Sequence, residues 1–127
     1  MSSKGADQYQ QNSHQVASKE QLVLFVYEKA ITEMWEAREK IAAGQKSETV
    51  ESLHLVRRLF MELQSSLDEE GGEVAGNLYQ LYTYILREVS RAGFEGDVQA
   101  LENAIAVAEQ LYEGFFEAFT VSDPSAT

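Results

Sequence analysis

The side chains best suited to chemistry include a histidine on a predicted helix. Glu51 and His54 form a Glu-x-x-His pattern, the unit from which di-iron sites in helical bundles are built. Such a site needs a second copy of this motif and further carboxylates, and the chain has 2 histidines in all. The other histidine, His14, lies in a polar N-terminal stretch. We therefore expect no di-iron site.

His54 could instead accept a phosphoryl group, as an exposed histidine does in phosphotransfer bundles. The residues that follow it are Leu55, Val56, Arg57 and Arg58. The two arginines could attract phosphate, whereas the bulky apolar neighbours would crowd the imidazole. A histidine phosphotransfer domain is kept as an alternative, with a surface histidine as the default interpretation.

A cluster of acids is the other candidate, and it falls in a glycine-containing turn. It consists of Asp68, Glu69, Glu70 and Glu73. The alternating Asp/Asn spacing of a calcium loop is absent, so a solvated turn is expected. No serine or threonine has a credible base partner, and no glycine-rich phosphate loop follows a strand. We predict a protein that is not an enzyme and that has no cofactor and no metal site.

The composition indicates one helical domain. The 127 residues are 44% apolar and 24% charged, and they include 1 proline, 8 glycines and no cysteine. Disulfides, thiolate catalysis and cysteine-ligated metals are thereby excluded. The net charge of −11 disfavours nucleic acid and anionic lipid as partners. No export signal or bilayer-spanning run is found, so we expect a cytoplasmic protein without membrane insertion.

Four segments show helical periodicity and are separated by short turns. They predict an all-α fold, an antiparallel up-down four-helix bundle over residues 18–119. Residues 1–17 are predicted to be a mobile arm, which could include a short extra helix, and residues 120–127 a frayed tail. The expected helices cover residues 19–43, 47–67, 73–92 and 98–119, with start signals at Ser18, Ser47 and Asp97 and stop signals at Gly44 and Gly93.

Two of these helices carry more apolar side chains than a bundle core needs. Residues 22–27 are apolar without interruption, and residues 74–86 contain no charge. A helix that is apolar all round must be covered all round, whereas a helix in a small bundle keeps one face in water. The cover could be the arm, a second copy of the chain or a partner. Alternatively, the tyrosines line a generous core with their hydroxyls at its rim.

Several short motifs follow one another along the chain. They are Tyr9-Gln10-Gln11-Asn12 in the arm, Leu63-Gln64-Ser65-Ser66-Leu67-Asp68, and Leu78-Tyr79-Gln80-Leu81-Tyr82-Thr83-Tyr84. Taken together, and over residues 9–116, they resemble the family of flagellar secretion chaperones called FliS. The sequence departs from the family at Glu28-Lys29, where Asp-Gly is usual, and at Phe115, where a tryptophan is frequent.

The resemblance implies a chaperone that binds the disordered C-terminal segment of flagellin. It would prevent premature polymerisation and keep the subunit ready for the flagellar type III export apparatus, an indirect partner. It also implies an arm that covers the binding surface when no client is present. The alternative is a module of the same fold for another flagellar client or regulator. We expect a monomer or a weak homodimer. The candidate partner-binding residues are Tyr9, Gln10, Leu22, Phe25, Val26, Leu78, Leu81, Tyr82 and Ile85.

Overall fold

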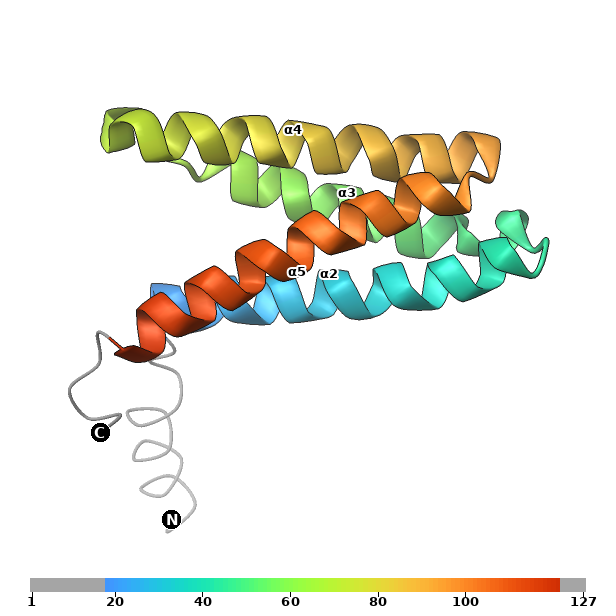
Figure 1. Ribbon diagram of the computed structural model, residues 1–127, viewed down its shortest axis with the longest axis horizontal. Helices are drawn as coiled ribbons and strands as arrows, with labels where there is room; N and C mark the ends of the chain where they lie inside the picture. The colour runs from blue at the N-terminus through green and yellow to red at the C-terminus, as the bar shows by residue number, and fades with distance from the viewer. Residues whose placement is uncertain (1–17, 122–127) are drawn as a thin grey trace, which may run out of the picture.

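Four long helices account for most of residues 18–121, the part of the chain that the structure, a computed structural model, describes (Figure 1). They run up and down as an antiparallel bundle, which confirms the predicted all-α fold. The predictions for residues 1–17 and 122–127 lie outside the described part. The elements in order are α2 (Lys19–Ala42), the short 3-10 helix η1 (Lys46–Thr49), α3 (Val50–Ser65), the 3-10 helix η2 (Glu69–Gly71), α4 (Gly72–Glu95) and α5 (Val98–Val121).

Three of the predicted helix signals are confirmed. Ser18 caps α2 through a capping box, in which the Gln21 amide donates to Ser18 Oγ at 3.1 Å and the Ser18 amide donates to Gln21 Oε1 at 3.2 Å. At the start of α5, the Ala100 amide donates to Asp97 Oδ1 at 3.1 Å. Gly44 has a φ of 78° and follows the last turn of α2, where its amide donates to the Ile41 carbonyl.

Gly93 does not end α4, contrary to the sequence prediction. The helix continues to Glu95 and ends at Gly96, which has the left-handed φ of 68° that favours glycine. Gly93 lies inside the helix, where an added Cβ would be 3.4 Å from the Leu53 side chain of α3. Its lack of a side chain therefore matters for helix packing rather than for chain reversal.

The other boundary errors lie at the ends of α3 and α5. Ser47 does not cap α3, because it lies inside the one-turn helix η1, which precedes α3. In this turn the Thr49 hydroxyl donates to the Lys46 carbonyl at 2.7 Å. The last α-helical residue of α3 is Ser65, and α5 continues through Val121. Thr120 is thus helical, with its hydroxyl donating to the Phe116 carbonyl. The frayed tail predicted from residue 120 therefore starts too early.

The core is a stripe of buried side chains from each helix. In α2 the buried stripe runs from Tyr27 to Ile41, and in α5 it runs from Ala100 to Ala108. Small residues between α4 and α5 let these two helices approach closely. The buried apolar residues are Tyr27, Ala30, Met34, Ala37, Ile41, Leu53, Val56, Phe60, Leu63, Tyr82, Ile85, Val89, Ala92, Ala100, Leu101, Ala104, Ile105 and Ala108.

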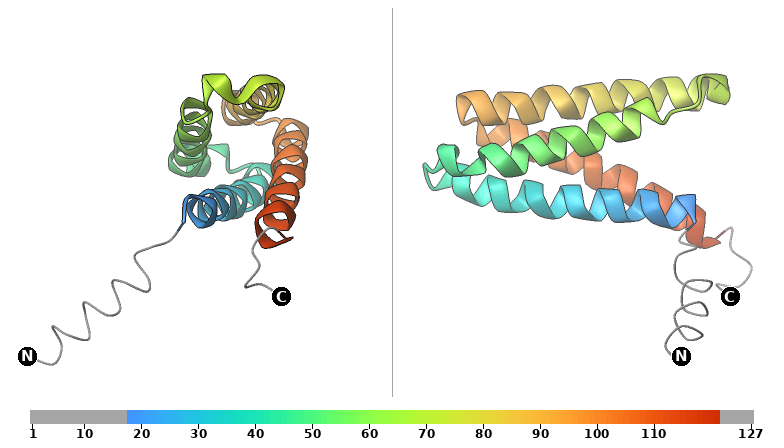
Figure 2. Two further views of the ribbon diagram at one scale, coloured as in Figure 1. Left: turned by 90° about the vertical axis from the view of Figure 1, so that its left-hand side faces the viewer. Right: turned by 180° about the vertical axis from the view of Figure 1, so that it is seen from behind.

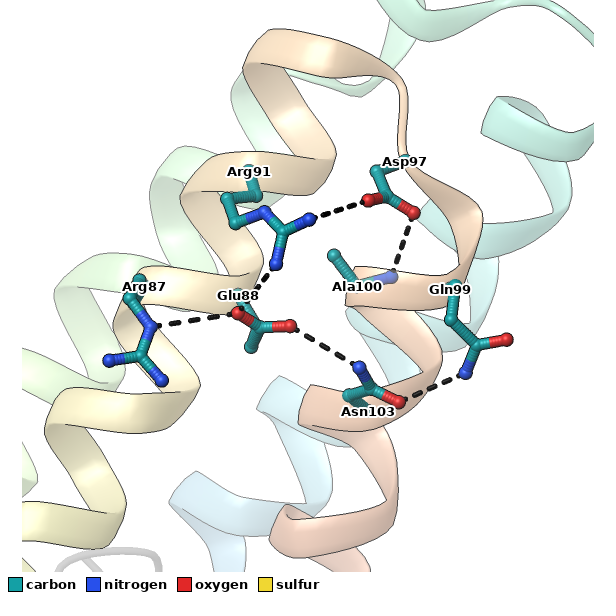
Figure 3. A network of polar contacts seen from close by, with 7 residues as sticks. All are labelled: Arg87, Glu88, Arg91, Asp97, Gln99, Ala100 and Asn103. Atoms are coloured by element: carbon teal, nitrogen blue, oxygen red, sulfur yellow. Dashed lines mark hydrogen bonds and ion pairs between the residues drawn. The ribbon is translucent and has the colours of Figure 1, made fainter.

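A polar network joins α4 to α5 near the turn between them (Figure 3). The Glu88 carboxylate is only 3% exposed, and it accepts from Arg91 Nη1 and from Asn103 Nδ2, each at 3.3 Å. Arg87 lies 3.6 Å away, and Arg91 also donates to Asp97 at 3.0 Å. A buried charge is tolerated when it is paired and hydrogen-bonded, so this network holds the two helices together here. Towards their other ends α4 and α5 diverge (Figures 1 and 2).

Candidate functional site

An aromatic layer crosses the middle of the bundle, with one ring from each long helix. Tyr27 of α2 packs on Phe60 of α3, Tyr82 of α4 and Phe115 of α5, with ring centroids 5.9, 6.5 and 5.6 Å apart. The centroids of Phe60 and Tyr82 are 6.0 Å apart. These are the separations at which tilted and edge-on aromatic pairs attract one another.

The hydroxyl groups of Tyr27 and Tyr82, the two tyrosines of the layer, form a hydrogen bond with each other. Their hydroxyl oxygens are 2.7 Å apart, with either one as the donor, and the side chains are 0% and 2% exposed. Burial raises the pKa of Tyr27, and the neighbouring Tyr82 raises it further. The pKa of Tyr82 is also raised by burial. Both hydroxyls therefore stay neutral at physiological pH and close the layer without help from water.

The tightly packed core stops close to this layer. Within the described residues, α2 has no buried side chain before Tyr27, α4 has none before Tyr82, and α5 has none after Ala108. In α3 only Leu63 is buried beyond Phe60. Because the helices are antiparallel, these segments lie at the same end of the bundle, on the left in Figure 1. We call it the open end and define it by the apolar side chains of Leu22, Phe25, Val26, Leu67, Val74, Leu78, Leu81 and Phe119.

The α4 part of the open end consists of positions that continue the core stripe but are only partly covered. Val74, Leu78 and Leu81 continue the spacing of three and four residues that is buried at Ile85 and Val89. Leu78 is half-buried against the core, yet Val74 is 68% exposed and Leu81 is 37% exposed. All three belong to the N-terminal half of α4, the half from which α5 diverges (Figure 2).

The α2 part of the open end faces away from the core. Leu22 is 52% exposed and Phe25 is 56% exposed, whereas Val26 is half-buried and packs against the core cluster. Neighbouring helices therefore cover part of the continuous apolar run of α2 and leave the rest in water. Apolar side chains grouped in this way mark an interaction surface more often than isolated ones do.

The candidate partner-binding residues are thus divided by the structure. Leu22, Phe25 and Leu81 are exposed, and Val26 and Leu78 are half-buried. Tyr82 and Ile85 are instead part of the core and present no accessible surface. Their apolar run is continuous with the exposed one, so the sequence did not reveal where burial ends. Tyr9 and Gln10 lie outside the described residues.

Val74 belongs to this surface although it was not among the candidates, and it is 68% exposed. The signal that could have found Val74 is its place in the first turn of a helix that follows a glycine-rich turn. A stripe residue there extends beyond the end of the preceding helix, α3.

The other motifs of the sequence form no site in the described residues. His54 is exposed and takes part in no hydrogen bond or ion pair there. In the acidic turn, Asp68 accepts from the Glu70 amide at 2.9 Å and so caps η2. Residues 18–121 contain no group of three potential metal ligands. None of the helices in this range has both the length and the hydropathy to span a membrane.

Comparison with known proteins identifies the family. The sequence model described as "Flagellar protein FliS" matches residues 2–122. The chain is 31% identical over 113 residues to the flagellar secretion chaperone FliS of Salmonella typhimurium, covering 87% of this chain and 81% of that protein. It is 33% identical over 114 residues to the protein of the same name from Campylobacter jejuni, covering 86% of each.

A solved structure described as a flagellar chaperone from bacteria has the same fold. It superposes with a TM-score of 0.73 at 21% identity and covers 94% of this chain and 98% of its own. The match of the family model over nearly the whole chain and the two relatives above 30% identity agree with each other. The chain belongs to the FliS family of flagellar secretion chaperones.

Proposed function

We propose that this protein binds the C-terminal segment of flagellin in the cytoplasm and that the open end is the binding surface. The observation that carries the proposal is the exposure of Val74 and Leu81 on the core-facing stripe of α4. These side chains occupy positions that a helix would cover in a complete bundle. An apolar helix of the client could therefore cover them as an additional packing partner.

Coupled folding and binding is the physical basis of this proposal. Covering the exposed part of a valine or leucine side chain contributes about 1–2 kcal/mol. Leu22, Phe25, Val74 and Leu81 together offer several such contributions. A disordered client loses conformational entropy as it becomes helical, which offsets part of this gain and keeps binding reversible. Reversible binding suits a chaperone that must release its client to the export apparatus.

We propose that the N-terminal arm covers the same surface when no client is present. The chain enters α2 at Lys19, at the open end, so residues 1–17 are attached beside the exposed side chains. Arm and client would then compete for Leu22 and Phe25. A client held there could not polymerise prematurely and would stay competent for type III flagellar export.

The test is calorimetric titration of the full chain with the C-terminal segment of flagellin from the same cell. Val74→Glu is the test variant and Val50→Glu is its matched control. Both valines are near the start of a helix, at 68% and 66% exposure, and they lie at opposite ends of the bundle. We expect wild type to bind with a large negative heat-capacity change and with new helix by circular dichroism.

The variants separate this surface from the rest of the molecule. Val74→Glu should weaken binding about tenfold or more, since it removes an apolar contact and places a charge in the interface. Val50→Glu should leave the affinity unchanged. Equal affinities for wild type and Val74→Glu would refute the open end as the site. No binding by folded wild type would refute flagellin as the client and would favour another flagellar protein.

A further inference from the structure

A row of carboxylates lies on α5 and forms no ion pair within the part of the chain that the structure describes. Glu109, Glu113 and Glu117 follow one another at intervals of four residues, so they are neighbours on one helix face. None of the three forms an ion pair with a described residue. Like charges at this spacing destabilise a helix, so this arrangement carries a cost in stability that no ion pair within residues 18–121 offsets.

Exposed aromatic side chains lie beside this row and fix two carboxylates in place. Trp35 of α2 donates from Nε1 to Glu109 Oε2 at 2.8 Å, and Tyr112 donates its hydroxyl to Glu28 Oε2 at 2.6 Å. Trp35 is 43% exposed, and Phe116, one turn beyond Tyr112, is 48% exposed. Because both donors are neutral, they orient the carboxylates and leave their charges intact.

Two adjoining hollows lie on this surface, the first between α2 and α5 and the second on α5 alone. The first has a volume of about 420 Å³ and the second about 500 Å³, and they share Tyr112 and Glu113 in their linings. We call this surface the α2–α5 groove. Its remaining lining residues are Glu28, Ile31, Thr32 and Glu109 in the first hollow and Phe116, Glu117 and Thr120 in the second.

We propose that the α2–α5 groove docks a basic amphipathic helix of a second protein partner. Apolar side chains on one side of that helix would fill the two hollows and pack on Tyr112 and Phe116. Lysines or arginines at intervals of four residues would lie against Glu109, Glu113 and Glu117. Aromatic contacts with a rim of complementary charge are the usual composition of a selective protein interface.

The charge of the chain itself argues for an outside partner. A second copy carries a net charge of −11, so two copies repel each other at an acidic groove. The arm does not fit either, since residues 1–17 contain Lys4 and Asp7 as their only residues charged at neutral pH besides the chain terminus. No α4 residue lines the groove, so the groove is separate from Val74 and Leu81, although its second hollow lies on the part of α5 that reaches the open end.

Trp35 provides the readout, because it is the only tryptophan of the chain and it contacts Glu109 at the groove. The probe is a synthetic helical peptide with leucines along one face and lysines at intervals of four residues on the flanks. A second peptide keeps the leucines and carries glutamate in place of every lysine. We expect saturable one-to-one binding of the lysine peptide, seen as a change in Trp35 fluorescence that weakens with salt, and no binding of the glutamate peptide.

A pair of double variants separates local recognition from general attraction. Glu113→Gln with Glu117→Gln should weaken binding of the lysine peptide about fivefold, as expected for two exposed charge pairs. The same double variant should unfold at a higher temperature than wild type, because two like-charge contacts are removed. Glu69→Gln with Glu70→Gln changes the net charge equally at a distant turn and should leave the affinity unchanged.

Several results would overturn the proposal. Equal weakening by both double variants would show attraction by net charge alone, and binding of both peptides would show apolar adhesion. Loss of lysine-peptide binding in Val74→Glu would place the peptide at the open end instead. Binding of the flagellin segment should be unchanged in Glu113→Gln with Glu117→Gln. The proposal for the groove and the proposal for the client therefore stand or fall separately.

Discussion

Replacing one tyrosine of the aromatic layer should destabilise the bundle, whereas replacing both should not. In wild type the hydroxyls of Tyr27 and Tyr82 are 2.7 Å apart and buried, and within residues 18–121 each is the only side-chain hydrogen-bond partner of the other. Tyr27→Phe leaves the Tyr82 hydroxyl buried without its partner, and Tyr82→Phe does the same to Tyr27. An unsatisfied buried hydroxyl costs about 1–3 kcal/mol, whereas replacing both partners with apolar groups can be nearly neutral.

The assay is urea denaturation followed by circular dichroism, with thermal unfolding as a second measurement. Each single variant should lose about 1–3 kcal/mol of unfolding free energy, or about 4 °C in Tm for each kcal/mol, and the m-value should not change. The double variant should lie within about 1 kcal/mol of wild type, giving a coupling energy of similar size to the single losses. Tyr79→Phe is the control, because Tyr79 is 54% exposed and its change should have little effect.

The result that would refute this reasoning is additivity. If the double variant loses the sum of the two single losses, the hydroxyls do not depend on each other. Each would then have an independent partner, and the layer would not be closed by the pair. If each single variant loses much less than about 1 kcal/mol of unfolding free energy, the reasoning is also wrong, because water must then reach the remaining hydroxyl.

Two further predictions concern pH and backbone freedom. Burial raises the pKa of Tyr27 and Tyr82 in the folded state above that in the unfolded chain. The unfolding free energy should therefore be unaffected by these groups below about pH 10 and should fall above it by about 1.4 kcal/mol per pH unit for each tyrosine. Urea titrations between about pH 9 and 11 should show a smaller loss for the double phenylalanine variant, and equal slopes for the two proteins would contradict the burial of these groups. Gly114→Ala should stabilise the protein by about 0.5–1 kcal/mol, because Gly114 lies inside α5 and an added Cβ meets nothing within 4 Å. Gly96→Ala should destabilise it by about 1 kcal/mol, because Gly96 has a left-handed φ of 68°. Thermal unfolding measures both changes, and Tm shifts of the same sign would contradict the different roles given to the two glycines.

Much of the fold could be predicted because its signals are local. The Ser18–Gln21 capping box and the Asp97 cap depend on residues three apart, so the sequence contains both partners of each bond. Gly93 and Gly96 could not be distinguished in this way. Gly96 has the left-handed φ of 68° and Gly93 lies inside the helix beside Leu53 of α3, and the sequence around the two glycines does not distinguish these environments. The difference between the two glycines depends on the packing of the helices, which a local sequence pattern does not contain.

The sequence predicts that apolar side chains on two helices need additional cover, but it does not predict which of these side chains are exposed. A continuous apolar run predicts that a helix needs more cover than usual, and Leu22, Phe25 and Leu81 are indeed exposed. The run itself does not say where α5 turns away from α4. Tyr82 and Leu81 are adjacent in sequence, yet one is 2% exposed and the other 37%. Adjacent helical positions point about 100° apart, so which of the two is covered depends on where the neighbouring helices lie around α4, and that arrangement depends on side chains far apart in the sequence.

The aromatic layer explains how one short bundle can be both stable and incomplete. On the side of the layer away from the open end, buried side chains from all four long helices and the Glu88 network hold the structure together. At the open end, several apolar side chains stay exposed, and each forgoes the stabilisation that burial would give. The boundary can be sharp because Tyr27 and Tyr82 satisfy their hydroxyls within the layer. An apolar helix arriving at the open end would therefore pack over a core whose buried hydroxyls are already paired, so its binding would leave neither hydroxyl of the Tyr27–Tyr82 pair without a partner.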